Sequence, residues 1–279
     1  MKSVVHLLLF ISIGALAACA PSTTRKISDT ADISSGIMNG IEVPPDFPLA
    51  RHVVAIRIVT PQGSGICTGT LLDKNLVLTA AHCAPANAKL FVVFSTTVTP
   101  QAESRPVDGF IVSPQWASNQ NQRRNTGDIA LLHFTGPQPA THRPLPILPA
   151  PHQRILREGT LVMLAGYGRN NVQPGQPTGS GILRRASTRL AKGVFSETEI
   201  LVEHTDGRGA CNGDSGGPAI VFLGGQAYVW GVTSRGIPTC DQGAVYTNAA
   251  TYELWVKKTI DELTRRERGG RNNPFNGLN

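Results

Sequence analysis

The sequence lacks several patterns that would identify other classes of protein. Its 279 residues show no evident internal repeat and no sustained helical periodicity before residue 251. Residues that ligate metals are not clustered, so we expect no metal site and no cofactor. Aromatic residues make up only 6% of the chain, and its basic stretches have neither interleaved aromatic residues nor a nucleic-acid-binding motif. These absences argue against a helical or repeat architecture and against nucleic acid as a partner.

Charge is present in excess of one sign but is concentrated near the C-terminus. The chain has 26 Lys and Arg against 19 Asp and Glu, a formal net charge of +7. Residues 257–271 carry a local excess of basic side chains. We expect these side chains to form a solvated helix face, and attraction to anionic lipid is the alternative.

Short apolar runs recur between clusters of Gly, Pro, Asn and Ser, as is typical of an all-β protein. The runs cover residues 53–59, 90–94, 161–165, 200–202 and 227–232. Residues 251–266 differ, because their apolar side chains are spaced as on one face of a helix. We therefore predict a folded all-β domain that ends in an amphipathic helix, followed by a flexible tail at 269–279.

The N-terminus has the pattern of an export signal. Lys2 precedes an apolar stretch from Val4 to Ala18, which is too short and too early for a membrane-spanning helix. Its end, Leu-Ala-Ala-Cys, resembles the bacterial lipoprotein box, which predicts a signal peptide at 1–18 and lipidation of Cys19. Ordinary signal cleavage near Ala17 or Ala20 is the alternative. Residues 19–36 are rich in Ser, Thr and Ala and are predicted to be a linker or propeptide.

Cysteine usage agrees with export. The chain has five cysteines, an odd number, and lipidation of Cys19 accounts for the one that pairing would leave over. The other four allow three disulfide connectivities, and disulfides imply an oxidising compartment.

The most informative segment is Gly-Asp-Ser-Gly-Gly-Pro at residues 213–218. Ser215 sits among glycines and one acid, so little crowds its hydroxyl. Chance would give this hexapeptide on the order of 10⁻⁵ times in a chain of this length. The segment predicts a nucleophilic serine on a tight turn, with an ordinary glycine-rich surface turn as the alternative.

A serine nucleophile needs a histidine to accept its proton and a carboxylate to orient that histidine. His82 follows the apolar run at 76–78, and Asp128 directly precedes another at 129–132. Taken singly, the histidine is typical of a core residue and the aspartate of a turn or cap. Together, in the order His82, Asp128 and Ser215, they predict a catalytic triad.

These three motifs resemble those of the trypsin-like (chymotrypsin-fold) serine proteases, and the resemblance extends over residues 37–268. Gly-Tyr-Gly at 166–168 and Val-Tyr-Thr at 245–247 add further matches. With the lipoprotein-like signal, the chain resembles a bacterial-type member. The resemblance implies an all-β fold of two packed six-stranded antiparallel β-barrels with a C-terminal α-helix, the barrels covering about 37–145 and 146–250 and the helix 251–266.

The resemblance also assigns roles to the site residues. His82 is expected to act as general base and acid, Asp128 to orient it, and Ser215 to attack the substrate. The backbone N–H groups of Gly213 and Ser215 are expected to form the oxyanion hole. The implied disulfides are Cys67 with Cys83 and Cys211 with Cys240.

Residues 37–40, Ile-Met-Asn-Gly, resemble the mature N-terminus of the family. In that family, a cut before the isoleucine creates an ammonium that pairs with the acid just before the nucleophile, here Asp214. The resemblance therefore implies activation by an activating protease that cleaves after Gly36. Because Gly36 is not basic, that activator is not implied to be trypsin-like.

The primary specificity pocket is carried over from the same resemblance. Its floor is expected at Gly209 beside Ala210, its walls at Gly236 and Ala244, and Tyr246 behind them. No carboxylate stands at the floor, so a buried Lys or Arg side chain would lack a partner. We therefore expect cleavage after small to medium uncharged residues.

Arg235 departs from the family, which has tryptophan between Ser234 and Gly236. Ser234 is still expected to support Asp128, and Ser234 and Gly236 to pair with substrate backbone. The arginine either favours acidic substrate residues or points to solvent.

The leading hypothesis is an exported serine endopeptidase that acts as a monomer on protein or peptide substrates. We expect it in the cell envelope as a lipoprotein, at the outer membrane or surface, or released after processing. The alternatives are a non-catalytic surface lipoprotein that binds through the protease scaffold, and a membrane-peripheral structural lipoprotein.

Overall fold

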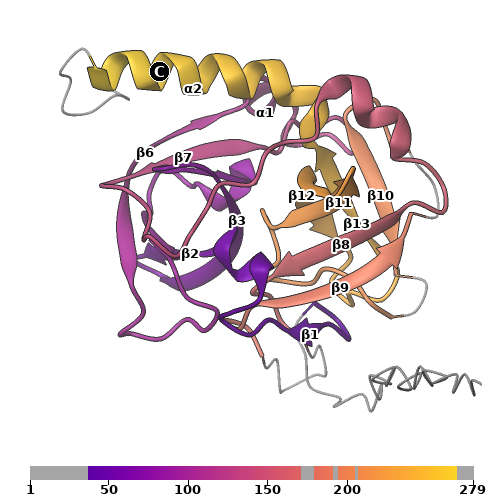
Figure 1. Ribbon diagram of the computed structural model, residues 1–279, viewed down its shortest axis with the longest axis horizontal. Helices are drawn as coiled ribbons and strands as arrows, with labels where there is room; N and C mark the ends of the chain where they lie inside the picture. Colours follow the sequence, from indigo (N-terminus) through magenta and orange to yellow (C-terminus); the bar gives the residue numbers. More distant parts are fainter. Residues whose placement is uncertain (1–36, 171–178, 191–193, 205–206, 269–279) are drawn as a thin grey trace, which may run out of the picture. The chain divides into compact units, whose positions relative to one another are not determined.

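The computed structural model describes residues 37–170, 179–190, 194–204 and 207–268. The predicted signal peptide, Cys19, the linker up to Gly36 and the tail at 269–279 lie outside these residues. The described chain is mostly β-structure, as predicted (Figure 1). Its strands are β1 (Ile41–Glu42), β2 (Val53–Thr60), β3 (Gly63–Asp73), β4 (Leu76–Thr79), β5 (Lys89–Val93), β6 (Ser104–Val112), β7 (Ala130–Phe134), β8 (Leu161–Gly166), β9 (Arg184–Arg189), β10 (Glu199–Glu203), β11 (Pro218–Leu223), β12 (Gln226–Gly236) and β13 (Gly243–Asn248).

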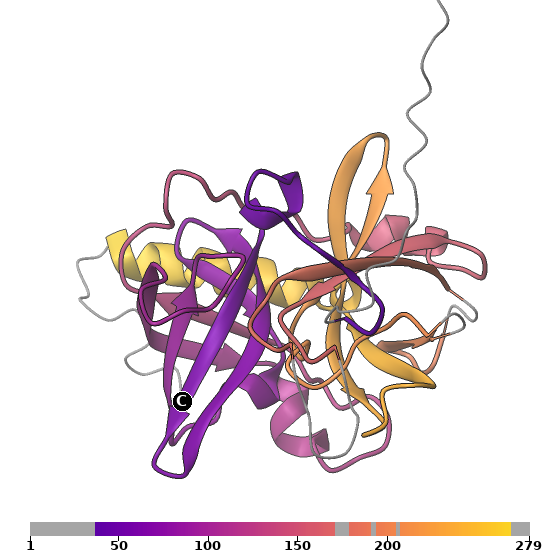
Figure 2. The same ribbon diagram turned by 90° about the horizontal axis from the view of Figure 1, so that it is seen from below.

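The first half is a closed antiparallel barrel in the strand order β2-β3-β4-β7-β6-β5. The long β2–β3 hairpin pairs in register from Val53 with Thr70 to Thr60 with Gly63 (Figure 2). The first four residues of β2 are fully buried, which explains why this strand reads as a continuous apolar run.

The second half is a seven-stranded antiparallel sheet in the order β1-β9-β8-β11-β12-β13-β10. It contains the six strands expected for the second barrel, and the short β1 adds to its edge. Among the described strands the ladder does not close, because β1 pairs only with β9 and β10 only with β13. The fold class is confirmed, with one closed barrel and one larger sheet. Trp230 and Tyr246 are fully buried in the core of this half.

Short helices link the strands: 3-10 turns η1 (Pro48–Arg51), η2 (Ala81–Cys83), η3 (Ala150–Ile155) and η4 (Ala249–Tyr252), and helix α1 (Pro114–Asn119). The C-terminal helix α2 spans Glu253–Arg268. It begins two residues later than the expected residue 251, because residues 251 and 252 belong to the 3-10 turn η4. Val256 and Leu263 are buried, whereas Leu254, which the helical pattern placed on the apolar face, is 66% exposed. Within the described part of the chain, no helix has the length and apolarity needed to cross a lipid bilayer.

Thr68 of β3 joins the barrel to the second half. Its backbone N–H donates to the carbonyl of Ser215 at 2.8 Å, and its hydroxyl donates to the carbonyl of Gly213 at 2.9 Å. The same hydroxyl oxygen accepts the N–H of Tyr167 at 3.0 Å. One side chain of the barrel therefore fixes two separate turns of the other half.

Candidate active site

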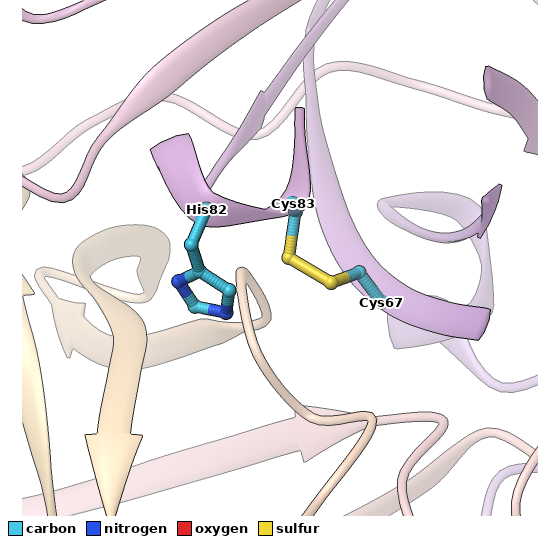
Figure 3. A group of neighbouring side chains, drawn as sticks. All are labelled: Cys67, His82 and Cys83. Atoms are coloured by element: carbon cyan, nitrogen blue, oxygen red, sulfur yellow. A yellow bond between two sulfur atoms is a disulfide. The ribbon is translucent and has the colours of Figure 1, made fainter. Parts of the chain in front are cut away.

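His82 lies in η2, directly after the buried strand β4. Cys83 beside it is joined to Cys67 of β3 by a disulfide, as predicted (Figure 3). The three side chains cluster closely enough to suggest a metal site. However, the two sulfurs are bonded to each other and provide no thiolate, so this cluster is a bracing disulfide beside a histidine.

Asp128 directly precedes β7, and its side chain is only 3% exposed. Its Oδ1 accepts the backbone N–H of His82 at 3.1 Å, and its Oδ2 lies 2.8 Å from His82 Nδ1. The Ser234 hydroxyl donates to the same Oδ2 at 2.6 Å. An ionised carboxylate only accepts hydrogen bonds, so Nδ1 carries the ring proton and Nε2 is left to accept one.

Ser215 lies in the turn before β11, and its carbonyl is also in contact with the Cys83 sulfur at 3.6 Å. Together with the bond from Thr68, this contact places the serine turn beside η2, which carries His82. Ser215 Oγ makes no hydrogen bond to a described residue, and catalytic hydrogen bonds of this kind commonly tighten only with substrate bound. The structure therefore brings the three predicted triad residues into one region.

Gly213 has a φ of 100°, in the region that favours glycine. A Cβ at this position would lie 2.8 Å from the Cα of Gly168. Both facts require glycine at this position.

Asp214 is fully buried, and its two carboxylate oxygens accept the N–H groups of Gly168 and Cys211, both at 2.8 Å. Burial raises the pKa of Asp214 to about 7, against the lowering effect of these two hydrogen bonds and of the positive charge on Arg184. A Cβ at Gly168 would lie 2.5 Å from this carboxylate, which explains the small residue there.

Ile37 is 1% exposed and packs in the core of the second half. Met38 pairs with Gly209, its N–H donating to the Gly209 carbonyl at 2.8 Å. The start of the described chain is thus anchored to the predicted pocket floor. Ile37 has a φ of 43°, which is strained for a β-branched residue.

The two residues predicted as walls of the pocket lie opposite each other on neighbouring strands. Gly236 of β12 pairs with Ala244 of β13, and Tyr246 is fully buried two residues further along β13. The predicted Cys211–Cys240 disulfide is present and ties the segment after Gly209 and Ala210 to the loop before β13.

His204 lies against Gly209, the predicted floor of the pocket, and the sequence did not reveal this position. A Cβ at Gly209 would lie 1.8 Å from His204 Nε2, so the imidazole fills the space that a side chain at 209 would take. Its Nδ1 lies 3.0 Å from the Cys240 carbonyl. No motif around this buried ring indicates that it lies beside Gly209.

Arg235 neither points freely to solvent nor presents an unpaired charge. Its guanidinium forms an ion pair with Glu199 of β10, through Nη1 at 2.8 Å and Nη2 at 3.0 Å. The Glu199 side chain is fully buried. The two residues are 36 positions apart in the sequence. The one sequence feature that could have pointed to this ion pair is the acid at the start of an apolar strand.

A cleft of about 490 Å³ opens beside Gly213. Two of its lining side chains are basic, and none is acidic. Among the described residues, neither Arg57 nor Arg169 forms an ion pair. The cleft is lined by Arg57, Ser64, Gly65, Ile66, Val98, Arg169, Ser180, Gly181, Asn212 and Gly213.

Known proteins resemble this chain over most of the described region. The chain is 29% identical over 214 residues to mouse vitamin K-dependent protein C, covering 70% of this chain and 46% of that protein. It is 28% identical over 256 residues to CLIP domain-containing serine protease C9 of Anopheles gambiae, covering 80% and 68%. The chain thus spans about half the length of the mouse relative. The family model Trypsin matches residues 46–256, and the chain belongs to this family of serine proteases.

Proposed function

We propose that this protein is an exported serine endopeptidase that hydrolyses peptide bonds through an acyl-enzyme. The observation that carries the proposal is the buried carboxylate of Asp128, which holds His82 Nδ1 while the turn with Ser215 is fixed beside the same histidine. A serine, a histidine and a buried acid in this relation are what nucleophilic acyl transfer requires.

In this proposal, Ser215 Oγ attacks the carbonyl carbon of the scissile bond and passes its proton to His82 Nε2. The N–H groups of Gly213 and Ser215 bind the resulting oxyanion. The histidine returns the proton to the leaving amine as the C–N bond breaks. Water, deprotonated by the same histidine, then attacks the ester carbonyl carbon. The histidine returns this proton to Ser215 Oγ as the bond between the acyl group and Oγ breaks. Asp128 remains ionised throughout and stabilises the imidazolium.

We propose that the residue before the scissile bond is small to medium-sized and uncharged. The imidazole of His204 occupies the place in front of Gly209, so the pocket floor is both raised and without a carboxylate. A buried Lys or Arg side chain would therefore lack a counter-charge and room to reach one.

We also propose activation by a cut after Gly36. Ile37 is already buried, its backbone is strained, and Asp214 is a buried acid without a cation of its own in hydrogen-bond contact among the described residues. A new ammonium at Ile37 would give this carboxylate a charged partner and stabilise the turn that carries the oxyanion donors.

Export of the protein is part of the proposal and is supported by its two disulfides. The lipid anchor at Cys19, the envelope or released location and the monomeric state remain proposals from the sequence.

Labelling with a fluorophosphonate tests the function. Protein that begins at Ile37 should be labelled and should cleave peptides, and Ser215→Ala should abolish both. Protein that begins at Ala20 should react much more slowly until it is cut after Gly36. Stable peptide binding without labelling of any form would instead support a non-catalytic binding protein.

A further inference from the structure

Glu199 is a buried carboxylate whose hydrogen bonds converge on the segment that carries Asp128. The backbone N–H groups of Asn125 and Thr126 donate to its two oxygens at 2.8 and 3.2 Å. The Thr126 hydroxyl donates to the same carboxylate at 3.0 Å, and the hydroxyl of Ser196, three residues before Glu199, donates to it at 2.9 Å. A residue of β10 in the second half therefore anchors a segment of the first half.

Arg235 provides the positive charge that this carboxylate needs. Besides its two contacts to Glu199, its Nη2 donates to the carbonyl of Arg123 at 2.8 Å. Its Nη1 also lies 3.3 Å from the Ser234 hydroxyl oxygen. The guanidinium thus links the carboxylate, the start of the Asp128 segment and the residue that donates to Asp128.

Two routes lead from this ion pair to the proposed triad. One runs along the backbone, from the anchored Asn125 and Thr126 to Asp128 two residues later. The other runs through the Ser234 hydroxyl. Arg235 donates a hydrogen bond to the Ser234 hydroxyl oxygen, so the hydroxyl hydrogen of Ser234 is directed to Asp128 Oδ2 at 2.6 Å. Both routes reach the carboxylate that holds His82.

We propose that Glu199 and Arg235 are positioning residues for catalysis, which hold Asp128 in the geometry that orients His82. The inference rests on the proposed function of the site. It explains the departure from the family at Arg235, because a tryptophan there would leave Glu199 buried without a counter-charge. It also means that Arg235 is occupied within the protein and is not a recognition site for acidic substrates.

The test uses the active form beginning at Ile37, with kcat per titrated active site and KM measured separately on one peptide substrate. Glu199→Gln keeps the shape but removes the charge, and it should lower kcat by about 10- to 100-fold, with KM little changed, because small displacements of a catalytic group have effects of this size. Arg235→Lys keeps the positive charge but loses the planar guanidinium fork, so its kcat should lie between those of the unmodified enzyme and Glu199→Gln. Glu103→Gln removes an ion pair with Arg105 outside this network and should behave like the unmodified enzyme.

A second readout separates positioning from general stability. The proton on His82 Nδ1, shared with Asp128, should give a downfield NMR signal, and Glu199→Gln should shift or broaden it in protein that remains folded. If Glu199→Gln does not fold, Thr126→Val removes a single donor to Glu199 and should still lower kcat and perturb this signal.

Unchanged kcat and NMR signal in the folded variants would overturn the inference. So would losses that track only the fraction of folded protein. If the unmodified protein reacts with neither fluorophosphonate nor peptide, the proposed function has failed. Normal activity that persists in the variants would refute only the positioning role.

Discussion

The pH dependence of stability should differ between the uncut and the cut chain, and Asp214 is the reason. Its folded-state pKa is raised to about 7 from an ordinary value of 3.8. A raised acid pKa means that the folded state holds its proton more tightly than the unfolded state. The contribution of this group is therefore fully present below pH 3.8 and is lost as the pH rises to about 7. At 1.36 kcal/mol per pKa unit, the loss is roughly 4 kcal/mol.

Cleavage before Ile37 should change this behaviour. The new ammonium would favour the ionised form of Asp214 and lower its pKa, so the cut chain should lose much less stability over the same pH range. Urea unfolding at a series of pH values would measure the difference, in a Ser215→Ala background that prevents self-digestion. Asp214→Asn removes the titrating group and is the matched control. Parallel stability curves for the cut and uncut chains would refute the reasoning.

Three further predictions concern other sites. Gly209→Asp should not create cleavage after Lys or Arg. It should lower the melting temperature, because the Cβ of the new side chain would clash with the His204 ring. New cleavage after Lys or Arg in a peptide library would contradict this prediction. Desolvation lowers the pKa of His133, but its hydrogen bonds to the carboxylates of Asp108 and Glu267 outweigh this effect and raise the pKa. The stabilisation from these bonds is therefore present below pH 6.5 and is lost as the pH rises through the raised value. Glu267→Gln should lower the melting temperature at pH 5 more than at pH 9, and an equal effect at both pH values would count against this reasoning. Arg169→Gln, in the cleft beside Gly213, should reduce kcat/KM for peptides with an acidic residue near the scissile bond more than for neutral peptides. Equal losses would show that the cleft does not select substrates by their charge.

The sequence predicted the parts of the site whose signals are local. Ser215, His82 and Asp128 each lie in a short motif beside an apolar run, and the structure brings the three segments together. The resemblance also implied the two disulfides, and both are present. The all-β class followed from the strand pattern, because short apolar runs between turns depend mainly on neighbouring residues. The two-barrel architecture was implied by the family resemblance and not by this pattern.

Features that depend on tertiary contact were missed. Glu199 and Arg235 are 36 residues apart, and nothing near either of them indicates that one neutralises the other. The role of His204 arises because Gly209 leaves space for its ring, which only the folded chain shows. The open second sheet similarly reflects which strand edges meet, and β1 joins that sheet through pairing with the distant β9.

Active-site labelling of protein that begins at Ile37 tests the central claim most directly. Mass spectrometry after fluorophosphonate treatment should find one adduct per chain, located on Ser215, and peptide cleavage should disappear as the adduct forms. Cleavage that continues after full labelling, or that survives Ser215→Ala, would show that this serine is not the nucleophile.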